Sequence, residues 1–233
     1  DLFMNCTRPD IACNDSDAIL FWSRLPITFI ALLLALFLFF WGRELGGTLA
    51  GLLATALFVF DPNTIAHGHY VTTDIGIAAF LFFAFYFFVH FLKRPSWKNV
   101  VLAGIFLGLA ELAKFSAVLL FPIFGLFTFT YAITKRFSPT PETQHPRFKL
   151  VAEYLGKYTL VVILCFLLIG LVYTLNTWNM PAEKTIANAN LVFAGNTPAK
   201  IFARDTLATL TTAPGLAPLA HYLLGVFMVF SRV

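Results

Sequence analysis

The chain has 233 residues, of which 59% are hydrophobic and only 12% are charged, and its mean hydropathy is +0.80. Charged residues make up about 25% of a typical soluble domain, so this composition excludes an ordinary soluble protein and predicts an integral membrane protein. The formal net charge of +4 gives no reason to expect a nucleic-acid partner, because basic residues in a membrane chain set its topology.

The apolar stretches predict an all-α membrane protein, a polytopic bundle of about six to seven transmembrane helices. We expect spans over residues 18–41, 45–60, 74–92, 98–113, 115–133, 158–175 and 216–233. Residues 176–215 are too polar to span a bilayer and predict a loop region folded on its surface. Gly104 and Gly108, four residues apart, are typical of helices that pack closely. Gly47 and Gly51 have the same spacing, but ordinary packing is the favoured interpretation there.

The N-terminal stretch, residues 1–17, is polar and contains Cys6 and Cys13. These two cysteines could pair in an oxidising compartment, but free thiols are equally allowed. Because the chain begins in this polar stretch and ends at Val233 inside an apolar run, we expect a fragment of a longer protein, with a membrane span before Asp1.

Basic residues in alternating loops predict the orientation of the chain. The side with compact basic loops carries Arg43, Lys93, Arg94, Lys98, Lys135, Arg136, Arg147, Lys149 and Lys157. The opposite loops are longer and carry fewer basic residues, so the first side is predicted to be cytoplasmic. Residues 1–17, 61–74 and 176–215 would then share the non-cytoplasmic face, which is the periplasm, the cell exterior or the ER lumen.

Ionisable residues gather in the passage from Asp61 to Asp74, between two apolar runs. Asp74 follows two threonines at the start of a predicted helix, where a carboxylate caps the helix and suits its dipole. A carboxylate there is equally well placed to orient an acceptor hydroxyl. His67 and His69, with Asp61 or Asp74, are a weak signal for a metal site, and interfacial histidines are the favoured interpretation; a divalent cation stays open.

Two cations are candidates for a phosphate site. Lys114 ends a short membrane helix on the predicted outer side, where its ammonium needs water or an anion. Glu111, three residues earlier, is the ordinary partner for it, and the alternative partner is a lipid-borne phosphate. Arg24 lies at the outer end of the first span, where topology anchoring explains it equally well.

Several short motifs carry a resemblance to a known family. They are Arg24-Leu25-Pro26, Gly46-Gly47, Ala66-His67-Gly68, Val71-Thr72-Thr73-Asp74, Gly108-Leu109-Ala110 and Lys114-Phe115-Ser116-Ala117. Together they resemble the bacterial dolichyl-phosphate-mannose protein mannosyltransferase-like family of multi-spanning C-type glycosyltransferases. The likeness is good over about residues 18–121 and looser elsewhere, and it implies that residues 1–233 are part of one such transmembrane domain.

The resemblance implies transfer of a sugar from a polyprenyl-phosphate donor to a protein, lipid or glycan acceptor on the non-cytoplasmic face of a bacterial inner membrane. It also implies that the leading catalytic carboxylate lies upstream of Asp1. Asp74 matches a second acidic residue of the family's site, and Lys114 matches a recurrent basic residue. We therefore predict Asp74 as a catalytic or site-shaping carboxylate, and Lys114 and Arg24 as donor-phosphate ligands. Asp61, His67 and His69 would line the site.

Two other functions fit the composition. In a transporter, Glu111 and Lys114 would line a pathway across the membrane, although no paired repeat of broken helices is present in the sequence. In a non-catalytic assembly subunit, the first outer loop of the full-length chain would lack an acidic pair.

Overall fold

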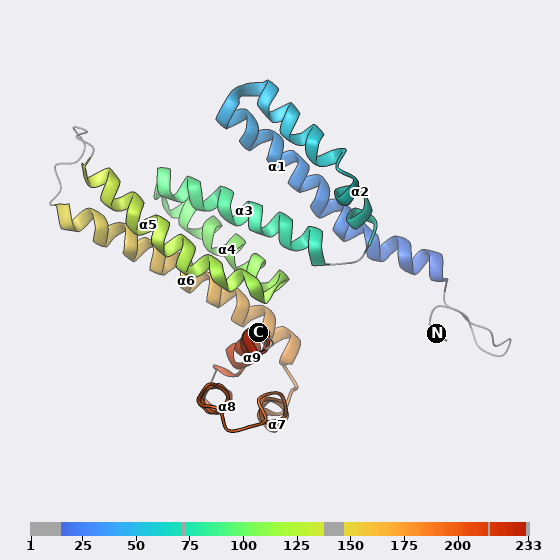
Figure 1. The fold of residues 1–233 in the computed structure, drawn as a ribbon, viewed down its shortest axis with the longest axis vertical. Helices are drawn as coiled ribbons and strands as arrows, with labels where there is room; N and C mark the ends of the chain where they lie inside the picture. The colour runs from blue at the N-terminus through green and yellow to red at the C-terminus, as the bar shows by residue number, and fades with distance from the viewer. Residues whose placement is uncertain (1–14, 71–72, 138–146, 214, 232–233) are drawn as a thin grey trace. The chain divides into compact units, whose positions relative to one another are not determined.

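The computed structural model describes residues 15–70, 73–137, 147–213 and 215–231, and each regular element in these ranges is a helix (Figure 1). Cys6 and Cys13 lie outside the described residues. The elements are α1 (Ser16–Val59), α2 (Pro62–His69), α3 (Thr73–Lys93), α4 (Trp97–Ala113), the 3-10 helix η1 (Phe115–Leu119), α5 (Leu120–Phe137), α6 (Arg147–Thr177), α7 (Ala182–Val192), α8 (Pro198–Thr212) and α9 (Ala217–Ser231). The chain divides into two compact units, Asp1–Phe83 and Ala84–Val233, and the division falls within α3.

Within the described ranges, four helical segments are long and apolar enough to cross a membrane: α1, α3, residues 115–135 and α6. Large apolar side chains on them are exposed, for example Leu57 at 76% and Leu167 at 63%, as expected of surfaces that face lipid. The prediction of an all-α membrane protein is therefore confirmed. The predicted total of six to seven spans also counts α4, with 17 residues, and α9, with 15, and that total stays a prediction.

In the first unit, α1 is two helices joined by a sharp break at Gly46 and Gly47 (Figure 1). Gly47 has φ of 82°, a left-handed conformation that glycine adopts without the strain of a side chain. The sequence predicted the turn at residues 42–44, slightly too early, because Gly42 remains helical. Pro26 lies inside α1 and not in its first turn, since the helix already begins at Ser16.

The two halves of α1 fold back on each other through glycine contacts. A Cβ atom on Gly51 would lie 2.6 Å from the Phe39 carbonyl oxygen, and one on Gly42 would lie 2.9 Å from the Gly51 Cα. The Thr55 hydroxyl donates across the same contact to the Ala35 carbonyl at 3.3 Å. Gly51 thus allows closer packing than the favoured interpretation expected, and it pairs with Gly42, while Gly47 forms the turn.

In the second unit, α4 packs along α6 through the predicted glycine pair. A Cβ atom on Gly104 would lie 2.7 Å from the Leu164 Cβ, and one on Gly108 would lie 3.2 Å from the Cys165 carbonyl oxygen. Gly104 therefore allows a separation that a side chain would disrupt, and Gly108 lies in a tight contact of the same kind, which agrees with the expectation from their spacing.

Replacing Gly104 with Ala is expected to destabilise the second unit by about 1–3 kcal/mol, because the added methyl group has no space against α6. Gly156 is the matched control, since a Cβ there meets no atom within 4 Å. Gly156→Ala should be neutral or slightly stabilising through helix propensity. Thermal unfolding of both variants in one detergent measures this difference. Equal melting temperatures would contradict the assigned packing at Gly104.

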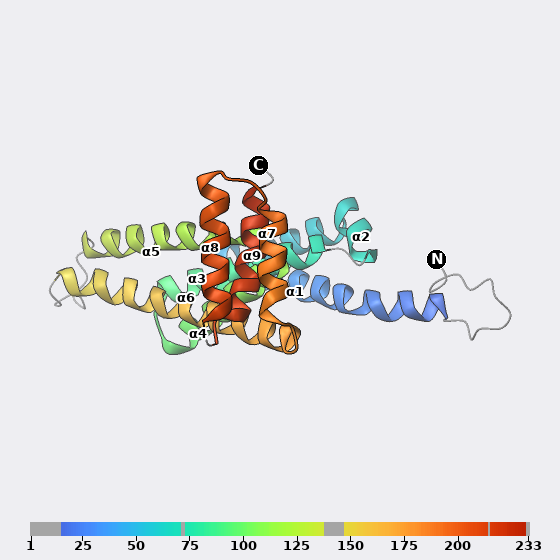
Figure 2. The ribbon, with the colours of Figure 1, turned by 90° about the horizontal axis from the view of Figure 1, so that it is seen from below.

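The predicted outer loop, residues 176–215, contains two helices, α7 and α8. Together with α9 they form a layer that lies crosswise to α5 and α6 (Figures 1 and 2). Ala203 and Leu207 of α8 pack with Ala189 and Phe193 around Ala220 of α9. The four-residue spacing along α8 gives it one buried face, which explains why so polar a segment folds. In this unit α9 differs in direction from α5 and α6, so its crossing of the membrane stays a prediction.

Candidate active site

The polar passage from Asp61 onward begins with a helix, α2, which the sequence did not predict. Asp61 is its N-cap: the carboxylate Oδ2 accepts from the Thr64 backbone N–H at 2.7 Å and from the Thr64 hydroxyl at 3.0 Å. Pro62 occupies the first turn, where its missing N–H has no intrahelical partner to lose. The Asp61 carboxylate is therefore engaged in capping α2.

Asp61→Ala is expected to destabilise α2 by about 1 kcal/mol, because two donors lose their acceptor. Asp61→Asn should keep most of the cap, since asparagine is as good at this position. Hydrogen exchange of the amides of residues 64–68 measures the effect locally. We expect these amides to exchange faster in Asp61→Ala than in Asp61→Asn. Equal exchange rates in the two variants would contradict the capping role.

The structure brings His67 and Asp74 together, as their shared passage suggested. The His67 Nδ1 lies 3.6 Å from the Asp74 Oδ2, and the two side chains are 46% and 52% exposed. Asp74 is in the first turn of α3, where the helix dipole favours a carboxylate. Such an exposed pair contributes about 0–1 kcal/mol when the imidazole is protonated, so the Asp74 carboxylate remains accessible to a ligand.

Arg24 lines a cavity of about 320 Å³ within the first unit. Its walls come from both halves of α1 and from α2: Arg24, Thr28, Ala31, Leu32, Ala35, Phe58, Val59, Thr64, Ile65 and Gly68. The cavity is mainly apolar, with a guanidinium and two threonine hydroxyls as its polar groups. Gly68 in its wall is the neighbour of His67, which contacts Asp74. Arg24 and the polar passage therefore belong to one local region, which the sequence could suggest only by resemblance.

Lys114 forms the break between α4 and η1 in the second unit. Its backbone is extended, with φ of −159° and ψ of 128°, its N–H donates to the Ala110 carbonyl, and its side chain is exposed. Glu111 is completely buried and accepts a hydrogen bond from Tyr222 at 2.8 Å. Among the described residues no ion pair joins Glu111 to Lys114, so the ordinary partner proposed from sequence is wrong.

The remaining predicted site residue, His69, ends α2, and its side chain is not described. The helical backbone over His67 and His69 replaces the extended loop that would place two such residues on one face. Within the ranges that the structure describes, no group of three His, Cys, Asp or Glu side chains could hold a metal ion.

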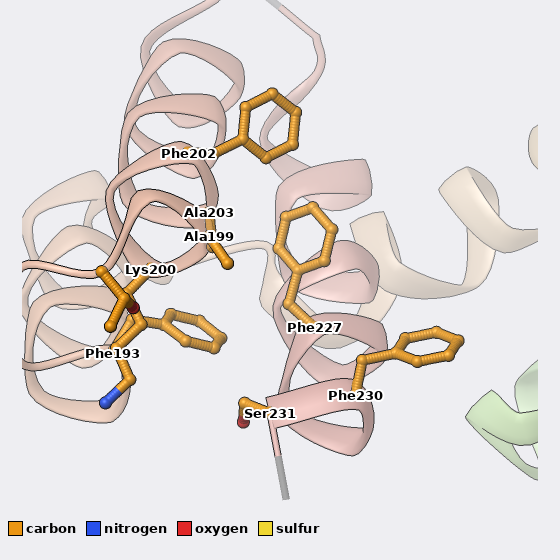
Figure 3. Close-up of a pocket in the computed structure, with 9 residues that line it drawn as sticks. Phe193, Ala199, Lys200, Phe202, Ala203, Phe227, Phe230 and Ser231 are labelled. Atoms are coloured by element: carbon orange, nitrogen blue, oxygen red, sulfur yellow. The ribbon is translucent and has the colours of Figure 1, made fainter. Parts of the chain in front are cut away.

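A second cavity, of about 420 Å³, lies within the α7–α9 layer (Figure 3). Rings of Phe193, Phe202, Phe227 and Phe230 line it, and Lys200 at its edge donates to the Ala194 carbonyl at 2.9 Å. None of the predicted site residues belongs to its lining. This cavity is an aromatic hollow of the layer, and it is not the region around Asp74 or Lys114.

Sequence reasoning missed the Glu111–Tyr222 hydrogen bond, the most buried polar contact near a candidate residue. The two residues are 111 positions apart, and no spacing rule connects them. A glutamate in an apolar helix signals that a partner exists, but the sequence alone does not identify it.

Comparison with known proteins agrees with the motifs. The family described as dolichyl-phosphate-mannose-protein mannosyltransferase matches residues 15–186, which include α1 to α6 and part of α7. No curated protein and no solved structure matches the chain significantly. The family match covers most of the chain, including Arg24, Asp74 and Lys114. This all-helical membrane chain therefore belongs to the dolichyl-phosphate-mannose-protein mannosyltransferase family and is a membrane glycosyltransferase of the mannosyltransferase type.

Proposed function

We propose that the protein transfers a sugar from a polyprenyl-phosphate donor to a hydroxyl acceptor on a protein, lipid or glycan, on the non-cytoplasmic face of a bacterial inner membrane. The family match over residues 15–186 is the observation that carries this proposal. The loop charges support the side of the membrane, because residues 61–74 lie opposite the basic loops.

The proposed reaction forms a bond between the acceptor oxygen and C1 of the sugar while the bond between C1 and the phosphate oxygen breaks. The acceptor hydroxyl loses a proton, and the polyprenyl phosphate leaves with the electron pair of the broken bond. A carboxylate that accepts a hydrogen bond from the hydroxyl assists the first change. Cations beside the phosphate assist the second, because they stabilise the charge that develops on it.

Asp74 is the carboxylate that we assign to the acceptor hydroxyl. It is half exposed, it lies at the positive end of α3, and its neighbour His67 is 3.6 Å away. His67 lies close enough to attract this carboxylate electrostatically when its imidazole is protonated. In line with the family resemblance, a further carboxylate upstream of Asp1 would complete the base.

Arg24 and Lys114 are the cations that we assign to the donor phosphate. Arg24 faces a cavity whose other walls are mainly apolar, a combination that suits a phosphate attached to a prenyl chain. Lys114 is exposed at a helix break, so its ammonium is available to a ligand. Asp61 supports the site indirectly, because it caps the helix that carries His67.

Transport has less support than glycosyl transfer. A transport pathway would need Glu111 and Lys114 to line one channel, but the Glu111 side chain is fully buried against Tyr222 while Lys114 is exposed. No observation on the described residues favours that function.

The proposal is tested with the full-length protein in sealed vesicles of known orientation. We expect labelled mannose to move from a polyprenyl-phosphate donor to an acceptor only when both are presented on the non-cytoplasmic face. A nucleotide-linked sugar should not replace this donor. Transfer from the nucleotide sugar alone, or transfer confined to the cytoplasmic face, would refute the proposed donor or the proposed side.

A further inference from the structure

Glu111 is a buried carboxylate that the proposed chemistry does not use. It lies in the last turn of α4, its side chain has no exposed surface, and the Tyr222 hydroxyl of α9 donates to its Oε2 at 2.8 Å. Its other oxygen, Oε1, has no hydrogen-bond partner among the described residues. A buried carboxylate with one acceptor site unsatisfied is costly, so stability alone does not explain why this pair is present.

Helix α9 makes a second contact just beyond Glu111, at Phe115. A Cβ atom on Gly225 would overlap the Phe115 ring, so any side chain there would force the ring to move. The rings of Phe115 and Tyr222 have centroids 5.9 Å apart. Tyr222 and Gly225 are three residues apart on one face of α9, and they contact residues on either side of Lys114.

Lys114 is thus the one residue between these two contacts at which the chain changes from α4 to η1. Its carbonyl accepts from the Ala117 N–H at 3.0 Å, and its own N–H donates to Ala110 at 3.1 Å. These two hydrogen bonds are what the Lys114 backbone contributes to holding the break. The direction of its exposed side chain therefore depends on how Glu111 and Phe115 are held, and α9 holds both.

We propose that Tyr222 and Gly225 are positioning residues, through which α9 fixes the helix break that presents the Lys114 ammonium to the donor phosphate. This proposal rests on the function proposed above. It adds that α9, which lies beyond the family match at residues 15–186, controls affinity for the lipid-linked donor. The expected effect is on donor binding, because Lys114 is the residue that α9 positions in this role.

The test compares Tyr222→Phe and Gly225→Ala with a matched control, Tyr158→Phe. Tyr158 is also a part-buried tyrosine in the second unit, and its hydroxyl donates to the Phe121 carbonyl at 2.6 Å. Glu111→Gln is the conservative variant, because its amide oxygen still accepts from Tyr222. Two quantities are measured on the full-length protein: hydrogen exchange of the Phe115–Leu119 amides and the donor and acceptor KM values.

We expect Tyr222→Phe and Gly225→Ala to speed exchange over Phe115–Leu119 and to raise the donor KM about tenfold, with the acceptor KM unchanged. Glu111→Gln should keep both quantities close to those of the unmodified protein, and Tyr158→Phe should change neither quantity. If Tyr222→Phe and Tyr158→Phe have equal effects, or if exchange rises while the donor KM is unchanged, the positioning role is refuted.

Exchange does not depend on sugar transfer. If the unmodified protein transfers no sugar, the proposed function and with it the donor role fail, and the exchange result still decides whether α9 fixes the break.

Discussion

Asp74→Asn is expected to lower kcat for sugar transfer by about 10²-fold or more, with little change in the donor KM. Asparagine has nearly the shape of aspartate but takes no proton from an acceptor hydroxyl. The structure places Asp74 in the first turn of α3, after Thr73, and not at the N-cap position that the sequence suggested. A residue that acts only through the helix dipole should lose no more activity on this change than another acidic residue in a first helical turn.

The matched control for Asp74 is Glu183→Gln. Glu183 is also an exposed acidic residue in the first turn of a helix, α7, so its variant loses the same favourable interaction with a helix dipole. Initial rates at saturating donor and acceptor measure both variants. Full activity of Asp74→Asn, or equal losses in the two variants, would remove Asp74 from the site.

Lys114→Ala is expected to lower kcat/KM for the donor by about 10²-fold, because the leaving phosphate loses a cation as its charge develops. Lys114→Arg should retain much of the activity, since the positive charge remains. The measurement is a donor titration at saturating acceptor. A loss seen in the acceptor KM alone would contradict the assignment of Lys114 to the phosphate.

Lys98→Ala is the matched control for Lys114. Lys98 is an exposed lysine in the first turn of α4, so it lies at the opposite end of the helix that Lys114 terminates. The loop charges predict that it lies on the cytoplasmic side, away from the proposed reaction. Its variant should keep the donor kcat/KM of the unmodified protein. A similar loss at both lysines would indicate a general effect of surface charge on the lipid substrate.

Features governed by local rules were predictable from the sequence. Apolar runs gave the membrane class, because backbone groups in lipid must be satisfied within a helix. The Gly104 and Gly108 spacing predicted the close approach to α6, where an added Cβ would be crowded at both glycines and most of all at Gly104. The nearness of His67 to Asp74 followed from their shared passage between two helices.

Three features were not predicted, and one of them depends on a distant partner. Helix α2 begins at the Asp61 cap. The passage from Asp61 to Asp74 was interpreted as a loop instead, because its composition is polar. The turn of α1 formed at Gly47, since only there does the backbone take the left-handed conformation. Glu111 was paired with its sequence neighbour Lys114, whereas its partner is Tyr222, far along the chain. In each case a tertiary contact or a backbone angle decided between local possibilities of similar energy.

The central claim is that this protein uses a lipid-linked sugar, and the ratio of polyprenyl phosphate released to sugar transferred tests it most directly. Both products are quantified in one reaction of the full-length protein with labelled polyprenyl-phosphate mannose and acceptor. The account predicts one polyprenyl phosphate released for each sugar joined to the acceptor, with both signals falling together in Asp74→Asn and Lys114→Ala. Release without transfer, or transfer that continues undiminished in both variants, would contradict it.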